Sequence, residues 1–179
     1  MKFKNLEMTG FKSFSEKTTI LIEKGLTGIV GPNGCGKSNI VEALRWCMGE
    51  NSAKSMRGSG MEDVIFSGTS NRPSKNISEV SLLLDNHEKN GPIHLKDFDE
   101  ISVKRKIEKD KGSKYYINDR EVRARDVQTF FADLSTGAHS PSLISQGRIG
   151  QLVIAKPIER KSILEEAAGI SGIHARRQE

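Results

Sequence analysis

The feature that most constrains this chain is a glycine-rich stretch that matches the pattern G-x-x-x-x-G-K-[ST] at every fixed position. It reads Gly31-Pro32-Asn33-Gly34-Cys35-Gly36-Lys37-Ser38. A short apolar run, Leu26 to Val30, precedes it, and apolar residues spaced as on one face of a helix follow it from Ile40 to Met48, before Gly49. A buried strand, a glycine loop and a helix in this order predict an α/β fold with a phosphate-binding P-loop.

The residue types in this loop suit a nucleoside triphosphate with Mg²⁺. Glycines let the backbone wrap a polyphosphate and direct several N–H groups at its oxygens, and the following helix adds partial positive charge at its first turn. Lys37 can reach the β- and γ-phosphates, and the Ser38 hydroxyl can bind Mg²⁺. Cys35 is expected to pack rather than to react.

Hydrolysis also needs an acidic residue for the metal, and the sequence offers weak candidates. Leu82-Leu83-Leu84-Asp85-Asn86 has one aliphatic residue too few and Asn in place of the usual Glu, so a strand that ends in an Asp turn is favoured. Leu134-Ser135-Thr136-Gly137 only partly resembles an ABC signature. We therefore predict a phosphate-binding lobe without its own catalytic acid.

The remaining pattern predicts a mostly antiparallel β layer beside the P-loop part. Strands are expected at 3–8, 17–22, 77–84, 101–107 and 142–145, and as a hairpin of 115–117 with 121–123 around Asn118-Asp119-Arg120. Helices are expected through Val127, Phe130, Phe131 and Leu134, and from Pro157 onward.

Length and composition fit one domain. The chain has 179 residues with 35% hydrophobic residues, no apolar run near the ~20 residues of a membrane helix, and no apolar leader. Two cysteines give no disulfide framework, so a reducing, cytoplasmic location is expected. Because no apolar run is long enough for a membrane helix, no membrane contact is expected. The net charge of +5 mildly favours an anionic partner.

An ordered set of short motifs resembles the N-terminal half of the ATPase head of SMC proteins of the bacterial chromosomal type. It runs from Gly10 to Gly169 and includes Gly10-Phe11-Lys12-Ser13-Phe14, the loop with Asn39-Ile40, Ala43-Leu44-Arg45-Trp46, Lys54-Ser55-Met56-Arg57-Gly58, Asp63-Val64-Ile65-Phe66, Ile144-Ser145-Gln146-Gly147-Arg148 and Glu165-Glu166-Ala167-Ala168-Gly169.

The resemblance implies an ABC-type ATPase half-head. Residues 1–170 would be the N-terminal lobe, and residues 171–179 the start of a coiled coil. The second acidic motif and the signature would then lie in a C-terminal lobe elsewhere in the full-length chain.

The resemblance also implies roles for individual residues. Gly31 to Asn39 would hold ATP, with Ser38 and Gln146 near Mg²⁺ and Gln146 also near the attacking water. Lys12 and Ser13 would contact the ribose and base region, and Arg57 would approach the nucleotide at the dimer interface; an exposed turn and a solvated arginine are the alternatives. The catalytic set would be Lys37, Gln146 and Arg57.

The implied function is ATP-dependent engagement of two heads, with hydrolysis driving chromosome condensation, partitioning and DNA loop capture at the nucleoid. The implied partners are the C-terminal lobe, a second SMC head in a homodimer, a kleisin-type subunit and double-stranded DNA without sequence specificity. This fragment alone is expected to be inactive. A RecF- or RecN-like repair ATPase, an ABC transporter subunit and a non-catalytic tethering lobe remain alternatives. Candidate DNA contacts are Arg57, Lys104, Arg105, Lys106, Lys109, Lys111, Lys114, Arg120, Arg123 and Arg125. For each of them taken singly, a solvated face of a strand or hairpin is the favoured interpretation.

Overall fold

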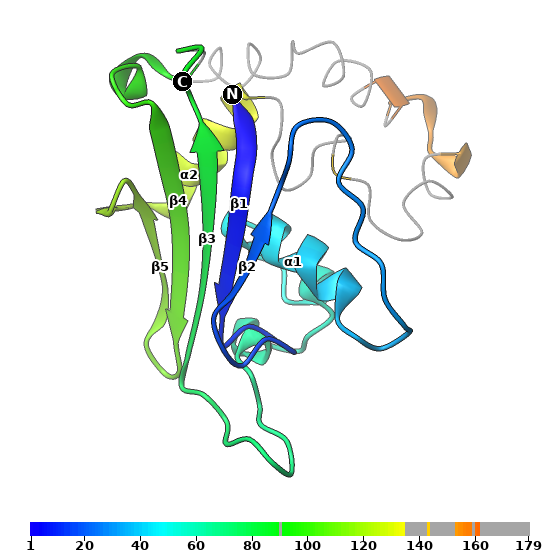
Figure 1. The fold of residues 1–179 in the computed structure, drawn as a ribbon. Helices are drawn as coiled ribbons and strands as arrows, with labels where there is room; N and C mark the ends of the chain where they lie inside the picture. The colour runs from blue at the N-terminus through cyan, green and yellow to red at the C-terminus, as the bar shows by residue number, and fades with distance from the viewer. Residues whose placement is uncertain (90, 135–142, 144–152, 159, 162–179) are drawn as a thin grey trace.

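A six-stranded antiparallel sheet with the order β2-β1-β3-β4-β5-β6 organises the structure (Figure 1). The computed structural model describes residues 1–89, 91–134, 143, 153–158 and 160–161. The strands are β1 (Lys2–Thr9), β2 (Thr18–Leu21), β3 (Ile77–Asp85), β4 (Glu100–Glu108), β5 (Gly112–Ile117) and β6 (Arg120–Val122). The helices are α1 (Lys37–Cys47) and α2 (Ala124–Asp133), with short 3₁₀ turns η1 (Lys54–Met56), η2 (Met61–Val64) and η3 (Ile93–Leu95). The predicted antiparallel layer is confirmed.

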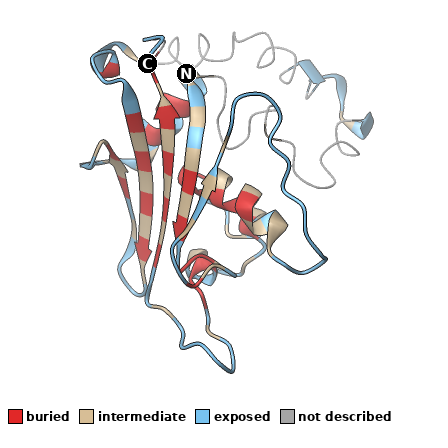
Figure 2. Cartoon of the chain, viewed as in Figure 1, coloured by how far each residue is buried: buried red, intermediate tan, exposed pale blue. Residues whose placement is uncertain are grey.

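The core lies on one face of this sheet. Alternate side chains of β3 and β4 are buried, which Figure 2 shows as red bands along both strands. α1 packs on β3 and β4, and α2 packs on β5. The buried residues of α1 are Ile40, Glu42, Ala43, Trp46 and Cys47. α1 therefore fixes the end of the glycine loop against the sheet.

The predicted hairpin between β5 and β6 is confirmed in detail. Ile117 pairs with Arg120, which leaves Asn118 and Asp119 as a two-residue turn. Their φ angles are +47° and +61°. Positive φ at both central residues is typical of a type I′ turn, which Asn and Asp tolerate better than most residues.

The prediction of a strand at 26–30 is wrong, because the structure has no strand there. Leu26 and Val30 are 100% and 93% exposed, and no described strand pairs with the segment. A strand is stable only when a neighbour takes its backbone hydrogen bonds, and an apolar sequence does not show where that neighbour is. The helix expected from Pro157 is confirmed at residues 157–158 and 160–161. The strand expected at 142–145 lies outside the described residues, except for Leu143.

Arg105, proposed above as a DNA contact, is a core residue instead. It is 2% exposed, and its guanidinium lies 4.5 Å from the ring centre of Trp46 and 4.6 Å from that of Tyr115. It donates hydrogen bonds to the backbone oxygens of Trp46, at 2.9 Å, and Glu50, at 2.7 Å. Burial lowers the pKa of Arg105 to about 10. The alternation of β4 places residue 105 on the same face as Val103, so it cannot reach DNA.

Candidate nucleotide-binding site

The glycine loop ends at a helix N-terminus that is ready for an anion. Gly34 and Gly36 have φ angles of +82° and +95°, which side chains rarely adopt, so these positions favour glycine. α1 begins at Lys37 with no side-chain cap at Gly36 and no acidic residue in its first turn. The first N–H groups of α1 therefore face no competing carboxylate, and the exposed Ser38 lies beside them.

The side chain of Lys37 forms hydrogen bonds with the start of the glycine loop. Its Nζ donates to the backbone oxygens of Gly31, at 2.7 Å, and Pro32, at 2.6 Å, and lies 3.7 Å from Cys35 Sγ. The ammonium is thus held at the loop, where a polyphosphate would meet it. Cys35 is exposed, so the expectation that it packs is wrong: the loop around it lies on the surface.

Ser13 lies directly against the end of the glycine loop. A Cβ atom on Gly36 would lie 2.5 Å from Ser13 Oγ. The Asn39 amide nitrogen donates to the same Oγ at 2.9 Å. The neighbouring Lys12 is fixed by its backbone N–H, which donates to Val64 O at 2.7 Å. The 12–13 turn and the P-loop therefore form one continuous site.

Arg57 reaches this site from a separate loop. It follows η1 in the left-handed region, with a φ of +54°. Its guanidinium donates to Asn39 Oδ1 at 2.9 Å, and its Nε forms an ion pair with Glu42 Oε1. The structure therefore brings Lys12, Ser13 and Arg57 together at the first turns of α1.

The loop behind Arg57 is held by Asp63. Its carboxylate accepts hydrogen bonds from the backbone N–H groups of Ser59, at 2.6 Å, and Gly60, at 3.0 Å. These bonds, with one from the Ser59 hydroxyl, lower the pKa of Asp63 below its usual value. The carboxylate therefore stays ionised and ties the loop from Arg57 to η2.

Glu42 is the site residue that the sequence reasoning missed. It lies three residues after Asn39 on α1, so both side chains can project to the same side of the helix. One carboxylate oxygen pairs with Arg57 and the other with Lys12, whose Nζ also donates to Met56 O. The signal available in the sequence was an acidic residue beside apolar Val41 and Ala43 on the P-loop helix.

The other candidates stand apart from this cluster. Gln146 lies outside the described residues, as do residues 135–137 of the partial signature. Asp85 pairs with Lys2 in the sheet, whereas Thr9 at the other end of β1 leads into the 12–13 turn. Lys2 and Thr9 are seven residue steps apart along the strand (9 − 2), roughly 23 Å at ~3.3 Å per step. Asp85 therefore lies far from Ser38, and its carboxylate contacts His87 at 2.6 Å.

The described residues contain no group of three or more His, Cys, Asp and Glu side chains arranged to hold a metal. The location of the catalytic acid therefore stays a prediction.

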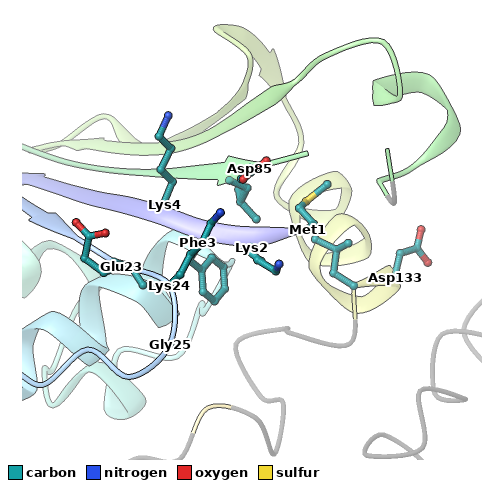
Figure 3. Close-up of a pocket in the computed structure, with 12 residues that line it drawn as sticks. Met1, Lys2, Phe3, Lys4, Glu23, Lys24, Gly25, Asp85 and Asp133 are labelled. Carbon is teal, nitrogen blue, oxygen red and sulfur yellow. The ribbon is translucent and has the colours of Figure 1, made fainter. Parts of the chain in front are cut away.

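A cavity of about 750 Å³ lies away from the glycine loop (Figure 3). Figure 3 shows Lys2, Lys4, Asp85 and Asp133 around it, and Leu134 from the end of α2 also lines it. None of the predicted nucleotide-site residues lines this cavity. Its volume therefore does not identify it as the nucleotide site.

Comparisons with known proteins show the family of this chain. The sequence profile of the RecF/RecN/SMC N terminal domain matches residues 2–147. The chain belongs to this family. The chain is 57% identical, over its full length, to the chromosome partition protein Smc of Cereibacter sphaeroides, of which it covers 16%. The chain therefore spans about a sixth of the length of these curated Smc relatives.

Solved structures identify the fold as that of an SMC head. The Smc head domain of Pyrococcus furiosus, bound to the C-terminal domain of ScpA, superposes with a TM-score of 0.88 at 32% identity, over 99% of this chain and 44% of that one. An SMC ATPase studied for ATP-driven dimerization gives a TM-score of 0.82 at 33% identity, over 93% of this chain and 99% of that one. The resemblance to the N-terminal lobe of a P-loop, ABC-type SMC head is confirmed.

The repair-ATPase alternative is weaker. A RecF structure with ATP gives a TM-score of 0.51 at 20% identity over 68% of this chain and 28% of that one, a likeness that concerns the fold alone. Among the described residues, no helix is long and apolar enough to cross a bilayer.

Proposed function

We propose that this chain is the ATP-binding N-terminal lobe of the head of a chromosome-partitioning SMC ATPase. Residues 1–170 form the lobe, and residues 171–179 begin a coiled coil. The observation that carries the proposal is the joining of the glycine loop, Ser13 and Arg57 through Asn39 and Glu42 on α1. A loop that only turned the chain would need none of these connections.

Each site residue has a defined task in this proposal. The backbone from Gly31 to Asn39 and the N-terminus of α1 hold the triphosphate, and Lys37 supplies positive charge to it. Ser38 and Gln146 serve Mg²⁺, and Gln146 also orients the attacking water. Lys12 and Ser13 contact the ribose and base region, while Arg57 supplies charge from the adjoining loop. Bound Mg²⁺ would neutralise charge on the phosphates.

The C-terminal lobe of the full-length protein supplies the missing acid and signature segment. The exposed run at 26–30 supports this assignment, because its backbone groups lack strand partners in the described structure directly before the P-loop. A strand from a second lobe pairing there would also cover Leu26 and Val30.

The whole protein then acts as a homodimer in which ATP joins two heads and hydrolysis releases them. A solved relative is described by ATP-driven dimerization and DNA-stimulated activation, and two others are bound to domains of ScpA. By this likeness we assign a second head, DNA and a kleisin-type subunit as partners, and the nucleoid as the site of action. Chromosome partitioning is the resulting function, by likeness to the Smc relatives.

The test uses the full-length protein that contains this chain. Its ATPase rate should rise more steeply than linearly with protein concentration, because two heads must meet. DNA should increase the rate further. A rate per head that is independent of concentration would contradict the proposal.

A further inference from the structure

We infer that Glu42 is a positioning residue that holds Arg57 in place for the nucleotide. The inference rests on the proposed function, since it gives Arg57 a task at the bound triphosphate. It concerns a residue on α1 whose ion-pair partners, Lys12 and Arg57, come from two loops outside the glycine loop.

The carboxylate of Glu42 is buried. Its side chain is 10% exposed, and Glu is almost never buried unless a partner balances its charge. Both of its oxygens are used: Oε1 pairs with Arg57 Nε, and Oε2 pairs with Lys12 Nζ. The Lys12 side chain is itself 13% exposed. Glu42 is therefore a fixed anion to which two loops are attached.

Arg57 is held by two residues of α1. Glu42 and Asn39 contact the guanidinium through Nε and one terminal nitrogen. A guanidinium has five N–H groups, so other donors remain for a further anion. The Arg57 side chain is 57% exposed, whereas Arg105 of the core is 2% exposed and places its donors on backbone carbonyls. Arg57 is anchored along one edge and accessible at the other.

The anchored edge of Arg57 is also connected to the glycine loop. Asn39 donates to Ser13 Oγ while it accepts from Arg57, and Ser13 lies against Gly36 at the end of the glycine loop. The anchored edge of Arg57 is therefore connected, through Asn39 and Ser13, to the end of the glycine loop at which phosphate is expected. Without the Glu42 carboxylate, Arg57 would keep one contact on α1, and it would lie near a Lys12 ammonium whose charge is no longer balanced.

A double-mutant cycle in the full-length protein tests this inference. The variants are Glu42→Gln, Arg57→Ala and the two combined, and the measurements are kcat at saturating ATP and the Kd for Mg-ATP. Glu42→Gln keeps the side-chain shape and removes its charge. We expect it to lower kcat roughly tenfold, within the coupling range of residues in contact, and to change the Kd less than about threefold, since the glycine loop and Lys37 hold the phosphates.

The kcat of the double variant decides the test. If Glu42 acts through Arg57, Glu42→Gln lowers kcat little or not at all once Arg57 is Ala. Glu42→Asp, which retains the charge on a shorter side chain, should keep a higher kcat than Glu42→Gln. It also keeps the test open should Glu42→Gln fail to fold, because an Asp variant that folds with a kcat below that of Arg57→Ala would overturn the inference.

Asn86→Ala is the matched control for lost stability. Asn86 is fully buried and bonds to Leu95 O, Phe98 O and Gly91 N, away from the glycine loop. The Asn86→Ala substitution should lower Tm but should not lower kcat as Glu42→Gln does. Equal losses of kcat in Asn86→Ala and Glu42→Gln would reduce Glu42 to a structural role.

Two further outcomes separate the inference from the proposed function. Additive losses for Glu42→Gln and Arg57→Ala would overturn the positioning role while leaving the nucleotide site intact. Unimpaired Mg-ATP binding by Lys37→Ala would instead overturn the nucleotide site itself.

Discussion

Gly36→Ala should destabilise the chain more than any other single methyl group added to the glycine loop. Its φ of +95° is a left-handed conformation, which costs an alanine about 1–2 kcal/mol. The new Cβ would also lie 2.5 Å from Ser13 Oγ, so Ser13 must move and release its 2.9 Å hydrogen bond from Asn39. A hydrogen bond of this kind contributes about 0.5–1.5 kcal/mol. The total is about 1.5–3.5 kcal/mol, or roughly 3–14 °C in Tm for a domain of this size.

Gly34→Ala is the matched control. Gly34 also has a positive φ, of +82°, but a Cβ atom there would meet nothing within 4 Å. Its substitution should therefore cost only the backbone strain, about 1–2 kcal/mol. The difference between the two variants, about 1 kcal/mol, measures the contact between Gly36 and Ser13.

Urea denaturation of the 179-residue chain measures both costs, and a Ser13→Gly background isolates the contact. With glycine at position 13 the clash is absent, so Gly36→Ala should then cost no more than Gly34→Ala. The reasoning is refuted if the two alanine variants are equally stable with Ser13 present, or if Ser13→Gly leaves their difference unchanged.

Four further expectations follow from the same site and core. Lys37→Ala should abolish or severely weaken Mg-ATP binding in isothermal titration while the melting curve is preserved; equal affinities would contradict the site. Gln146→Ala should spare most of the ATP affinity and impair turnover of the full-length protein, and a normal kcat would remove it from the catalytic set. The isolated chain should show no appreciable ATPase activity, and robust turnover independent of concentration would contradict a split head. Arg105→Met should lower stability by about 1–3 kcal/mol, because it removes the Arg105 donor from the buried carbonyl of Glu50 and leaves the carbonyl of Trp46 with the N–H of Gly49. DNA binding should be unchanged, and weaker binding by the folded variant would restore Arg105 as a contact.

The features that could be predicted from the sequence are those that neighbouring residues determine. The glycine loop needs Gly34 and Gly36 because of their backbone angles, and the β5–β6 turn suits Asn118 and Asp119 for the same reason. The period-2 alternation in β3 and β4 reports burial on one face of the sheet. The SMC resemblance added the association of Lys12, Ser13 and Arg57, which no spacing along the chain indicates.

The features that could not be predicted depend on contacts across the fold. Leu26 to Val30 has the composition of a buried strand, but burial depends on a partner strand that the sequence pattern does not locate. Arg105 was assigned by its charge, although the alternation of β4 already placed it with Ile101, Val103 and Ile107. The acidic residue between apolar Val41 and Ala43 was a local signal, but it did not identify the partners of Glu42, which lie 15 and 30 positions away along the chain (57 − 42 and 42 − 12).

The two ends of the phosphate loop are anchored very differently, and this difference explains why the lobe should not turn over ATP alone. The helix end is fixed, since α1 is buried on β3 and β4 and is joined to Ser13 and Arg57. The strand end, residues 26–30, is exposed and lacks a described strand partner. Fixing five backbone residues costs about 5–10 kcal/mol at ~1–2 kcal/mol each, and nucleotide contacts would have to offset that cost. A second lobe that pairs with this run would fix its backbone before ATP arrives and would bring the catalytic acid that we propose lies there, so binding strength and turnover should both depend on the complete head.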